Sequence, residues 1–257
     1  MKKIVGIFQR LFGVPWLVFG VQHFTYADFV AGLVPAYLPA RIFWVYLTGA
    51  AMIAAGLAFI FNRKASLAAV LLGTMLLMFI LLIHIPKLAS VDYSAINWTR
   101  ALQDLALAAT ALILAGVLSK QKAENNLLKN ISMVSRYLLA ILLIVFGVQQ
   151  FMNLDFLTAK VPVYLPLRMF WVYLTGMWLI ITGANVLINK KARLFAVALG
   201  AVLLIINLLN YVPALTSESR SALLLTAAML DLAITCGVFI LADSSPEENP
   251  LVETDAR

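Results

Sequence analysis

Long apolar stretches alternate with short polar segments along the whole chain. Each stretch is close to the roughly 20 residues that a helix needs to cross the hydrocarbon core of a bilayer. Strand-like alternation of polar and apolar residues is missing from the sequence, and backbone groups in lipid are satisfied within a helix. The pattern predicts an all-α integral membrane protein with eight transmembrane helices. We place these at residues 4–24, 42–61, 66–85, 99–118, 133–152, 169–188, 194–212 and 222–242.

The second half of the sequence repeats the first at an offset of 127 residues. The peptide FWVYLTG stands at Phe43–Gly49 and again at Phe170–Gly176. From Phe19 to Gly49, twenty of thirty-one positions are identical in the other copy. Each copy holds four predicted spans, so both enter the membrane from the same side, and we expect two four-helix bundles as a parallel repeat. The expected divisions are a first module at 1–118, a cytoplasmic linker at 119–132, a second module at 133–242 and a disordered acidic tail at 243–257.

The connection between the first two spans of each module is apolar. Residues 25–40 contain Pro35 and Pro39, which exclude an uninterrupted helix, yet the segment is too apolar for a free loop in water. We expect it to fold over the outer end of the bundle, and residues 158–167 to do the same in the second module. An ordinary loop resting on the lipid headgroups is the alternative.

Glycines recur seven residues apart on the first two spans. Gly13 and Gly20 share one face of the first span, as Gly49 and Gly56 do on the second. Small residues let helices approach closely in lipid, where no hydrophobic drive brings them together. We interpret these glycines as packing residues.

Composition and charge agree with a membrane protein. Hydrophobic residues make up 63% and charged residues 12%, against about 25% charged residues in a soluble domain. Twelve basic residues fall on one side of the predicted topology and six on the other, so the net charge of +7 is an orientation signal that places both termini in the cytoplasm. Nucleic-acid binding gains no support. The single cysteine, Cys236, excludes disulfides within the chain and CxxC redox chemistry.

The first apolar run follows Lys2 and Lys3 and superficially resembles a secretory signal. No small-residue cleavage site follows it, and the repeat aligns it with the span at 133–152. We therefore expect it to remain as the first transmembrane helix.

Polar side chains from four spans of the first module map to one level, in the outer third of the membrane. Such groups are costly in lipid and usually face a bundle interior or an aqueous cavity. We expect a pocket there for a quinone or another amphipathic molecule. Its candidate residues are Gln22, His23, Arg41 and His84 as hydrogen-bond donors, Trp44 and Tyr46 as apolar walls, and Asp104 as the proton partner.

Structural roles compete for some of the charged residues. Asp28 with Arg41, and Asp155 with Arg168, are candidate ion pairs that pin the segments over the bundle ends, and we favour this role over a catalytic one. Snorkelling of both arginines to the headgroups is an alternative. Asp104 and its counterpart Asp231 occur in both modules, which favours a hydrogen bond that both modules need.

The two histidines distinguish the modules. His23 is replaced by Gln150, and His84 by Tyr211. Two imidazoles could ligate a haem iron or metal, or hydrogen-bond quinone carbonyls. Neither a CxxCH motif nor a third strong ligand at a characteristic spacing is present, so we assign no metal site and favour a quinone over haem. The difference suggests one active and one structural module, although drift at two unimportant positions would look the same.

Scattered motifs in the first module match a known family. They are Phe19–Phe24 (FGVQHF), Val34–Pro39 (VPAYLP), Tyr46–Gly49 (YLTG), Gly56, the Arg63–Lys64 turn and Leu82–Lys87 (LIHIPK). With them, residues 1–118 and, more loosely, 133–242 resemble the DoxX-like family of small four-helix membrane proteins. That family is similar to membrane subunits of thiosulfate:quinone oxidoreductase. The resemblance implies a bacterial cytoplasmic membrane, a quinone-linked role, and a fused duplication in place of a homodimer. Its family-like polar residues are His23, Arg41 and His84.

The leading hypothesis is a membrane subunit that binds a quinone and works with a redox partner protein. The sequence lacks a nucleotide-binding glycine motif, a nucleophile–base pair and a cysteine cluster, so electrons would come from that partner or a soluble donor. A transporter or channel for a small solute is the first alternative. A non-catalytic assembly or stress-related membrane factor is the second.

Overall fold

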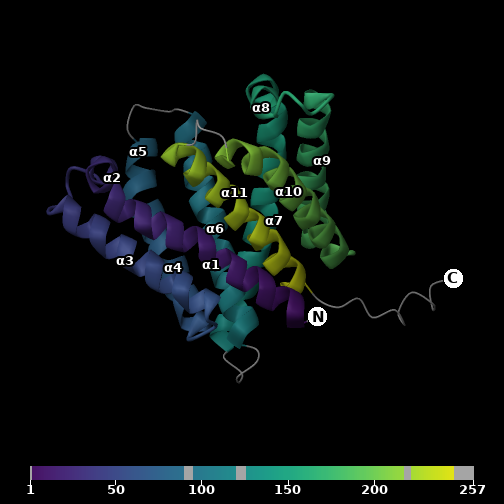
Figure 1. Cartoon of the computed structure of the whole chain (residues 1–257). Helices are drawn as coiled ribbons and strands as arrows, with labels where there is room; N and C mark the ends of the chain where they lie inside the picture. Colours follow the sequence, from purple (N-terminus) through teal and green to yellow (C-terminus); the bar gives the residue numbers. More distant parts are fainter. Residues whose placement is uncertain (1, 90–94, 120–125, 217–220, 246–257) are drawn as a thin grey trace.

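The computed structural model describes residues 2–89, 95–119, 126–216 and 221–245, and every regular element in these ranges is helical (Figure 1). The first half contains α1 (Lys2–Thr25), α2 (Ala27–Leu33), α3 (Arg41–Ile60), α4 (Ala65–Phe79), the π-helical turn η1 (Ile80–His84), α5 (Ile85–Ala89) and α6 (Ala95–Ser119). The second contains α7 (Asn126–Met152), α8 (Leu154–Lys160), α9 (Arg168–Leu187), α10 (Ala192–Thr216) and α11 (Ala222–Ser244).

Within the described ranges, seven helices are long and apolar enough to cross a membrane: α3, the continuous helix from α4 to α5, α6, α7, α9, α10 and α11. Large apolar side chains are exposed on them, such as Leu71 at 60% and Leu194 at 63%. So much exposed apolar surface is expected where lipid is the surrounding solvent. The predicted all-α, multi-pass membrane fold is confirmed for these seven helices. Helix α1 is not among these seven, so its crossing stays a prediction.

The long helices pack in a closed circuit. Along the chain α1 packs on α3, α3 on α4, α4 on α6, α6 on α7, α7 on α9, α9 on α10 and α10 on α11, and α11 returns to α1. Helices α6 and α11 also pack on each other across the middle. The two halves are therefore joined through α6–α7, α1–α11 and α6–α11. Alanines that are fully buried on α6, such as Ala108, Ala111 and Ala115, allow this central helix its close neighbours.

Glycines mark the closest approach of α1 to α3. A Cβ added to Gly13 would lie 2.6 Å from the carbonyl oxygen of Gly56, and one added to Gly20 would lie 2.7 Å from that of Gly49. These distances leave no room for a side chain. The predicted packing role of these four glycines is confirmed.

The segment between α1 and α3 is docked onto the helix formed by α4, η1 and α5. Pro86 has no N–H, so the carbonyl of Leu82, four residues earlier, loses its α-helical donor. The hydroxyl of Tyr37 donates to that carbonyl instead. The indole N–H of Trp44 donates to the Pro39 carbonyl at 3.0 Å and fixes the entry to α3.

The second half reproduces both contacts. Pro213 follows Leu209 by four residues, and the hydroxyl of Tyr164 donates to the Leu209 carbonyl. Trp171 donates to the Pro166 carbonyl at 3.0 Å. Figure 1 shows α2, α5 and α8 at one end of the molecule and the N-terminus at the other. Both segments thus fold back onto the helices at one end, as the apolar composition and the prolines predicted.

At the opposite end, polar side chains clamp the turns after α3 and α9. Gln9 Nε2 donates to the Phe59 carbonyl at 3.2 Å and to Asn62 Oδ1 at 2.9 Å. At the position equivalent to Gln9, Arg136 Nη2 donates to Asn189 Oδ1 at 2.6 Å. Asn62 and Asn189 have positive φ angles, a conformation that asparagine tolerates better than most residues. One clamp therefore uses a neutral amide and the other a guanidinium.

Helix α7 begins earlier along the chain than the predicted fifth span, 133–152. Its first residue is Asn126, so half of the predicted linker at 119–132 belongs to this helix. Ser132 is buried, and its hydroxyl donates to the Ile113 carbonyl at 3.3 Å, so a residue that reads as polar linker packs against α6. Residues 120–125 of the linker and 246–257 of the predicted tail lie outside the described residues.

Candidate functional site

A histidine–aspartate pair joins two of the membrane-spanning helices. His84, the last residue of η1, has its Nε2 2.8 Å from Oδ2 of Asp104 on α6. The two side chains are 14% and 28% exposed. A carboxylate only accepts hydrogen bonds, so Nε2 carries the proton, and in a neutral ring Nδ1 is then the acceptor. The aspartate thus fixes the tautomer of the imidazole, as carboxylates do in many functional sites.

The π-helical turn sets the direction of His84. One extra residue per turn shifts the helix face, and such turns are frequent at functional sites. The turn ends two residues before Pro86, but the proline does not account for it alone. Helix α10 remains α-helical around the equivalent Pro213.

The second half carries a different pair at the same positions. The hydroxyl of Tyr211 donates to Oδ2 of Asp231 at 2.5 Å. Each aspartate therefore receives one hydrogen bond from the preceding span, which fits the expectation that both modules need this contact. An imidazole can accept a proton at one ring nitrogen while it donates from the other, whereas a phenol has a single oxygen. Only the first pair has a partner suited to proton transfer.

Gln22 and His23 are engaged elsewhere. Nδ1 of His23 lies 2.7 Å from the Phe19 carbonyl, one turn earlier on the same helix. Gln22 turns to α11, where its amide donates to the Ala222 carbonyl at 3.3 Å and its carbonyl oxygen accepts from Thr226 at 3.1 Å. Gln22 therefore ties α1 to the second half, and the structure does not bring either residue into contact with His84.

The predicted pocket walls have structural contacts. Trp44 holds Pro39, and Tyr46 stacks on Phe24 with 5.3 Å between ring centroids. Arg41 is exposed at the start of α3. Among the seven predicted site residues, all of which are described, the hydrogen bond between His84 and Asp104 is the only one that joins two members.

The predicted ion pairs are not formed. Ion pairs in the described part of the chain include His84–Asp104 and Arg193–Asp243, the latter at 3.8 Å. The structure pairs neither Asp28 with Arg41 nor Asp155 with Arg168. The segments that these ion pairs were expected to pin are held by neutral hydrogen bonds instead. The donors are Tyr37 and Trp44 in the first half and Tyr164 and Trp171 in the second.

Sequence reasoning missed two sets of polar contacts. The first is the hydrogen bonds that Tyr37 and Tyr164 donate to the carbonyls left without a donor by the prolines. The signal in the sequence was that each half has a tyrosine 49 residues before the proline, at equivalent positions. The second is on α10 and α11, where Asn207 donates to Thr235 Oγ1 at 2.8 Å. Asn210 Oδ1 is buried there without a hydrogen-bond partner.

Within the described ranges, no group of three or more histidine, cysteine, aspartate or glutamate side chains is placed to hold a metal ion. Cys236 is buried in α11.

Comparison with known proteins gives one match. A family model described as "Domain of unknown function (DUF8561)" matches residues 12–119. The matched segment runs from within α1 to the last residue of α6, Ser119, and so falls within the first half of the repeat. The comparison with curated proteins and the comparison with solved structures gave no match.

Proposed function

We propose that the first half of this protein binds a quinone, or a similar lipid-soluble carbonyl compound, beside His84 and Asp104. The observation that carries the proposal is the 2.8 Å hydrogen bond between an imidazole and a carboxylate at the end of two apolar helices. Ionisable groups in such surroundings usually mark a functional site. The replacement of the histidine by Tyr211 in the second half limits the proposed site to one module.

The proposed chemistry uses the aspartate to orient the imidazole. A protonated His84 would donate a hydrogen bond to a quinone carbonyl and supply a proton when that oxygen is reduced. Asp104 would stabilise the imidazolium and return the ring to the same tautomer. Electrons would come from a redox partner protein, in line with the resemblance to subunits of quinone-linked enzymes.

The proposal includes the architecture in which the site operates. We infer eight spans in two parallel repeats in a bacterial cytoplasmic membrane, with both termini in the cytoplasm and the duplication in place of a homodimer. Equivalent contacts in the two halves support the repeat. So does the meeting of Thr110 and Gly237, which are themselves equivalent positions: a Cβ added to Gly237 would lie 2.5 Å from Thr110 Oγ1. Equivalent residues meet in this way near a twofold axis.

Titration of the purified protein in lipid nanodiscs with a short-chain ubiquinone tests the function, with tryptophan fluorescence as the readout. We expect saturable quenching in the unmodified protein. In His84→Gln and Asp104→Asn the affinity for the quinone should fall at least about tenfold, because each variant loses a hydrogen bond involving a charged group. Tyr211→Phe and Asp231→Asn alter the equivalent pair and should leave the affinity unchanged.

Two results would contradict the proposal. One is the absence of saturable quenching in the unmodified protein, and the other is an equal loss of affinity in the variants of both pairs. Solute uptake by reconstituted vesicles that Asp104→Asn abolishes, without quinone binding, would favour the transporter alternative.

A further inference from the structure

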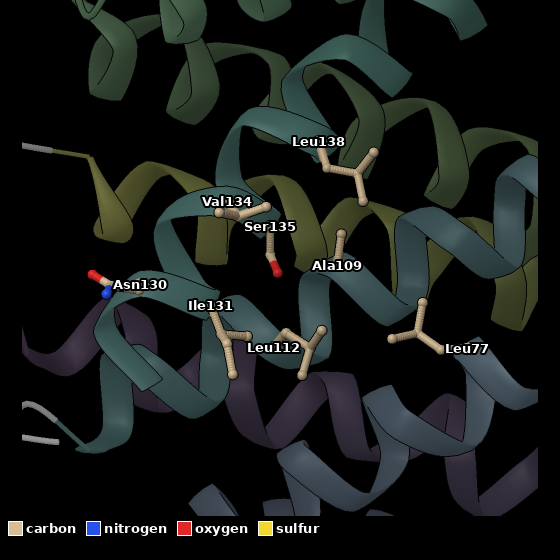
Figure 2. Close-up of a pocket in the computed structure, with 8 residues that line it drawn as sticks. All are labelled: Leu77, Ala109, Leu112, Asn130, Ile131, Val134, Ser135 and Leu138. Carbon is tan, nitrogen blue, oxygen red and sulfur yellow. The ribbon is translucent and has the colours of Figure 1, made fainter. Parts of the chain in front are cut away.

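A groove opens toward the lipid where α4, α6 and α7 meet (Figure 2). Its volume of about 350 Å³ lies within the range of small-molecule sites. Leu77 lines it from α4, Leu112 from α6 and Leu138 from α7, and these helices belong to the membrane-spanning set. Hydrocarbon therefore surrounds the groove, and neither His84 nor Asp104 lines it.

The equivalent position in the second half is closed by the protein itself. There, α10, α11 and α1 meet as α4, α6 and α7 do. At the places of Leu112 and Ser135 stand Phe239 and Phe8, which stack with 3.7 Å between ring centroids and 10° between ring planes. A Cβ added to Gly200 would lie 2.7 Å from the Phe239 ring, much as one added to the equivalent Gly73 would lie 2.8 Å from Leu112, so the stacked ring pair is what distinguishes the two junctions. Leucine and serine at the first junction leave the corresponding space open.

The lining of the groove is almost entirely apolar, and Asn130 stands at one end of it. Figure 2 shows Asn130 at one side of the groove and Leu77 at the other. Asn130 and its neighbour Lys129 are exposed near the start of α7. The basic residues of the chain concentrate at this end of the helices, which the positive-inside rule assigns to the cytoplasmic leaflet, where anionic lipids attract them.

From these observations we propose that the groove binds one acyl chain of an anionic phospholipid, with its phosphate group held by Lys129 and Asn130. The chain packs against leucine and alanine side chains that the protein leaves uncovered, and the headgroup meets a cation and an amide donor. The lipid takes the volume that Phe8 and Phe239 occupy at the other junction. This site is independent of the quinone proposal.

The second junction supplies the design of the test. Leu112→Phe combined with Ser135→Phe copies the stacked pair and should fill the groove. Native mass spectrometry of delipidated protein titrated with phosphatidylglycerol or zwitterionic phosphatidylcholine measures the lipid bound. We expect the unmodified protein to bind one phosphatidylglycerol more tightly than phosphatidylcholine. The filled variant should lose about tenfold in affinity, equivalent to the burial of roughly two methylene groups.

Further variants keep the test decisive if the double variant does not fold. Val134 is 64% exposed at the rim of the groove, so Val134→Trp should block it without disturbing the interior. Lys129→Gln should remove the preference for phosphatidylglycerol, while Leu71→Phe, at an exposed position on α4 outside the lining, should change nothing. Equal lipid binding by the unmodified, filled and Val134→Trp proteins would overturn the proposal, as would equal affinity of the unmodified protein for the two lipids.

Discussion

The carbonyl oxygen of Leu82 lies within a helix long and apolar enough to span the membrane, yet Pro86 removes its normal donor. An unsatisfied backbone group in lipid costs several kcal/mol, so a replacement donor has a large effect. Tyr37 provides it. We predict that Tyr37→Phe lowers the free energy of unfolding by about 1–3 kcal/mol, because the ring is retained and only the hydroxyl is lost. Unfolding of the detergent-solubilised protein by denaturant measures this change.

A double-mutant cycle isolates the cause. Pro86→Ala restores an N–H that can donate to the Leu82 carbonyl, so Tyr37→Phe should cost less in that background. Tyr164→Phe, at the equivalent carbonyl of Leu209, should behave like Tyr37→Phe. An identical cost of Tyr37→Phe with and without Pro86 would show that the hydroxyl does not compensate for the proline.

The directions of side chains on a helix explain why most of the predicted site residues do not contact one another. Successive residues on a helix are about 100° apart, so Gln22 and His23 cannot both aim at one pocket. Trp44 and Tyr46 are two residues apart and lie on nearly opposite sides of α3, one toward Pro39 and one toward Phe24. Sequence placed all these residues at one depth, but depth alone does not give direction. The sequence named His84 and Asp104 separately as members of one pocket, and the contact between them is found only in the structure.

At the scale of elements, the apolar lengths predicted the spans well. Helix α9 occupies Arg168–Leu187, against the predicted 169–188. The start of α7 was missed because Lys129, Asn130 and Ser132 read as a polar linker, although Ser132 packs against α6. The π-helical turn could not be predicted, since the second half has a proline at the same position and no such turn. The local sequence therefore predicts the positions of the helices, but not the early start of α7 or the π-helical turn.

Contact between α1 and α3 depends on glycine. We predict that Gly20→Ala destabilises the protein by about 1–3 kcal/mol, since its Cβ would lie 2.6 Å from Ile53 Cγ1 and the helices would have to separate. Gly6→Ala is the matched control on the same helix, because nothing lies within 4 Å of its added Cβ. It should be neutral or stabilising by up to about 1 kcal/mol through helix propensity. Thermal unfolding in detergent compares them, and equal destabilisation of both variants would contradict the packing argument.

At the scale of the whole molecule, contacts in the two halves can be compared position by position at the offset of the sequence repeat. Equivalent helices pack on equivalent partners, and Tyr37, Gln9 and Asp104 make contacts that recur at an offset of 127 residues. The repeat could not predict how the two halves pack against each other. Sequence similarity relates equivalent positions in the two copies and carries no information about contacts between the copies. The open groove at one seam and the stacked phenylalanines at the other are visible only in three dimensions.

Whether α1 crosses the membrane decides on which side the N-terminus lies. Helix α1 runs beside α11 from Gln22, which contacts Ala222, to Phe8, which stacks on Phe239. These contacts are 17 residues apart on α11 and 14 apart on α1, or roughly 26 and 21 Å at 1.5 Å per residue, which is most of the roughly 30 Å of the hydrocarbon core. A helix that accompanies a membrane-spanning neighbour over that distance crosses with it. We therefore predict eight spans, with the polar residues of α1 accommodated by contacts such as those of Gln9 with the turn at Asn62.

Cysteine labelling in intact cells with a membrane-impermeant maleimide tests the crossing. Cys236 is buried and should contribute little background. A cysteine introduced by Lys3→Cys should be labelled only after the membrane is permeabilised, since the N-terminus is expected inside. Ala36→Cys, at an exposed position between α2 and α3, should react in intact cells and serves as the outer control. Labelling of Lys3→Cys in intact cells would place the N-terminus outside and leave α1 packed against α11 without crossing, an arrangement that their contacts from Gln22 to Phe8 make hard to accommodate.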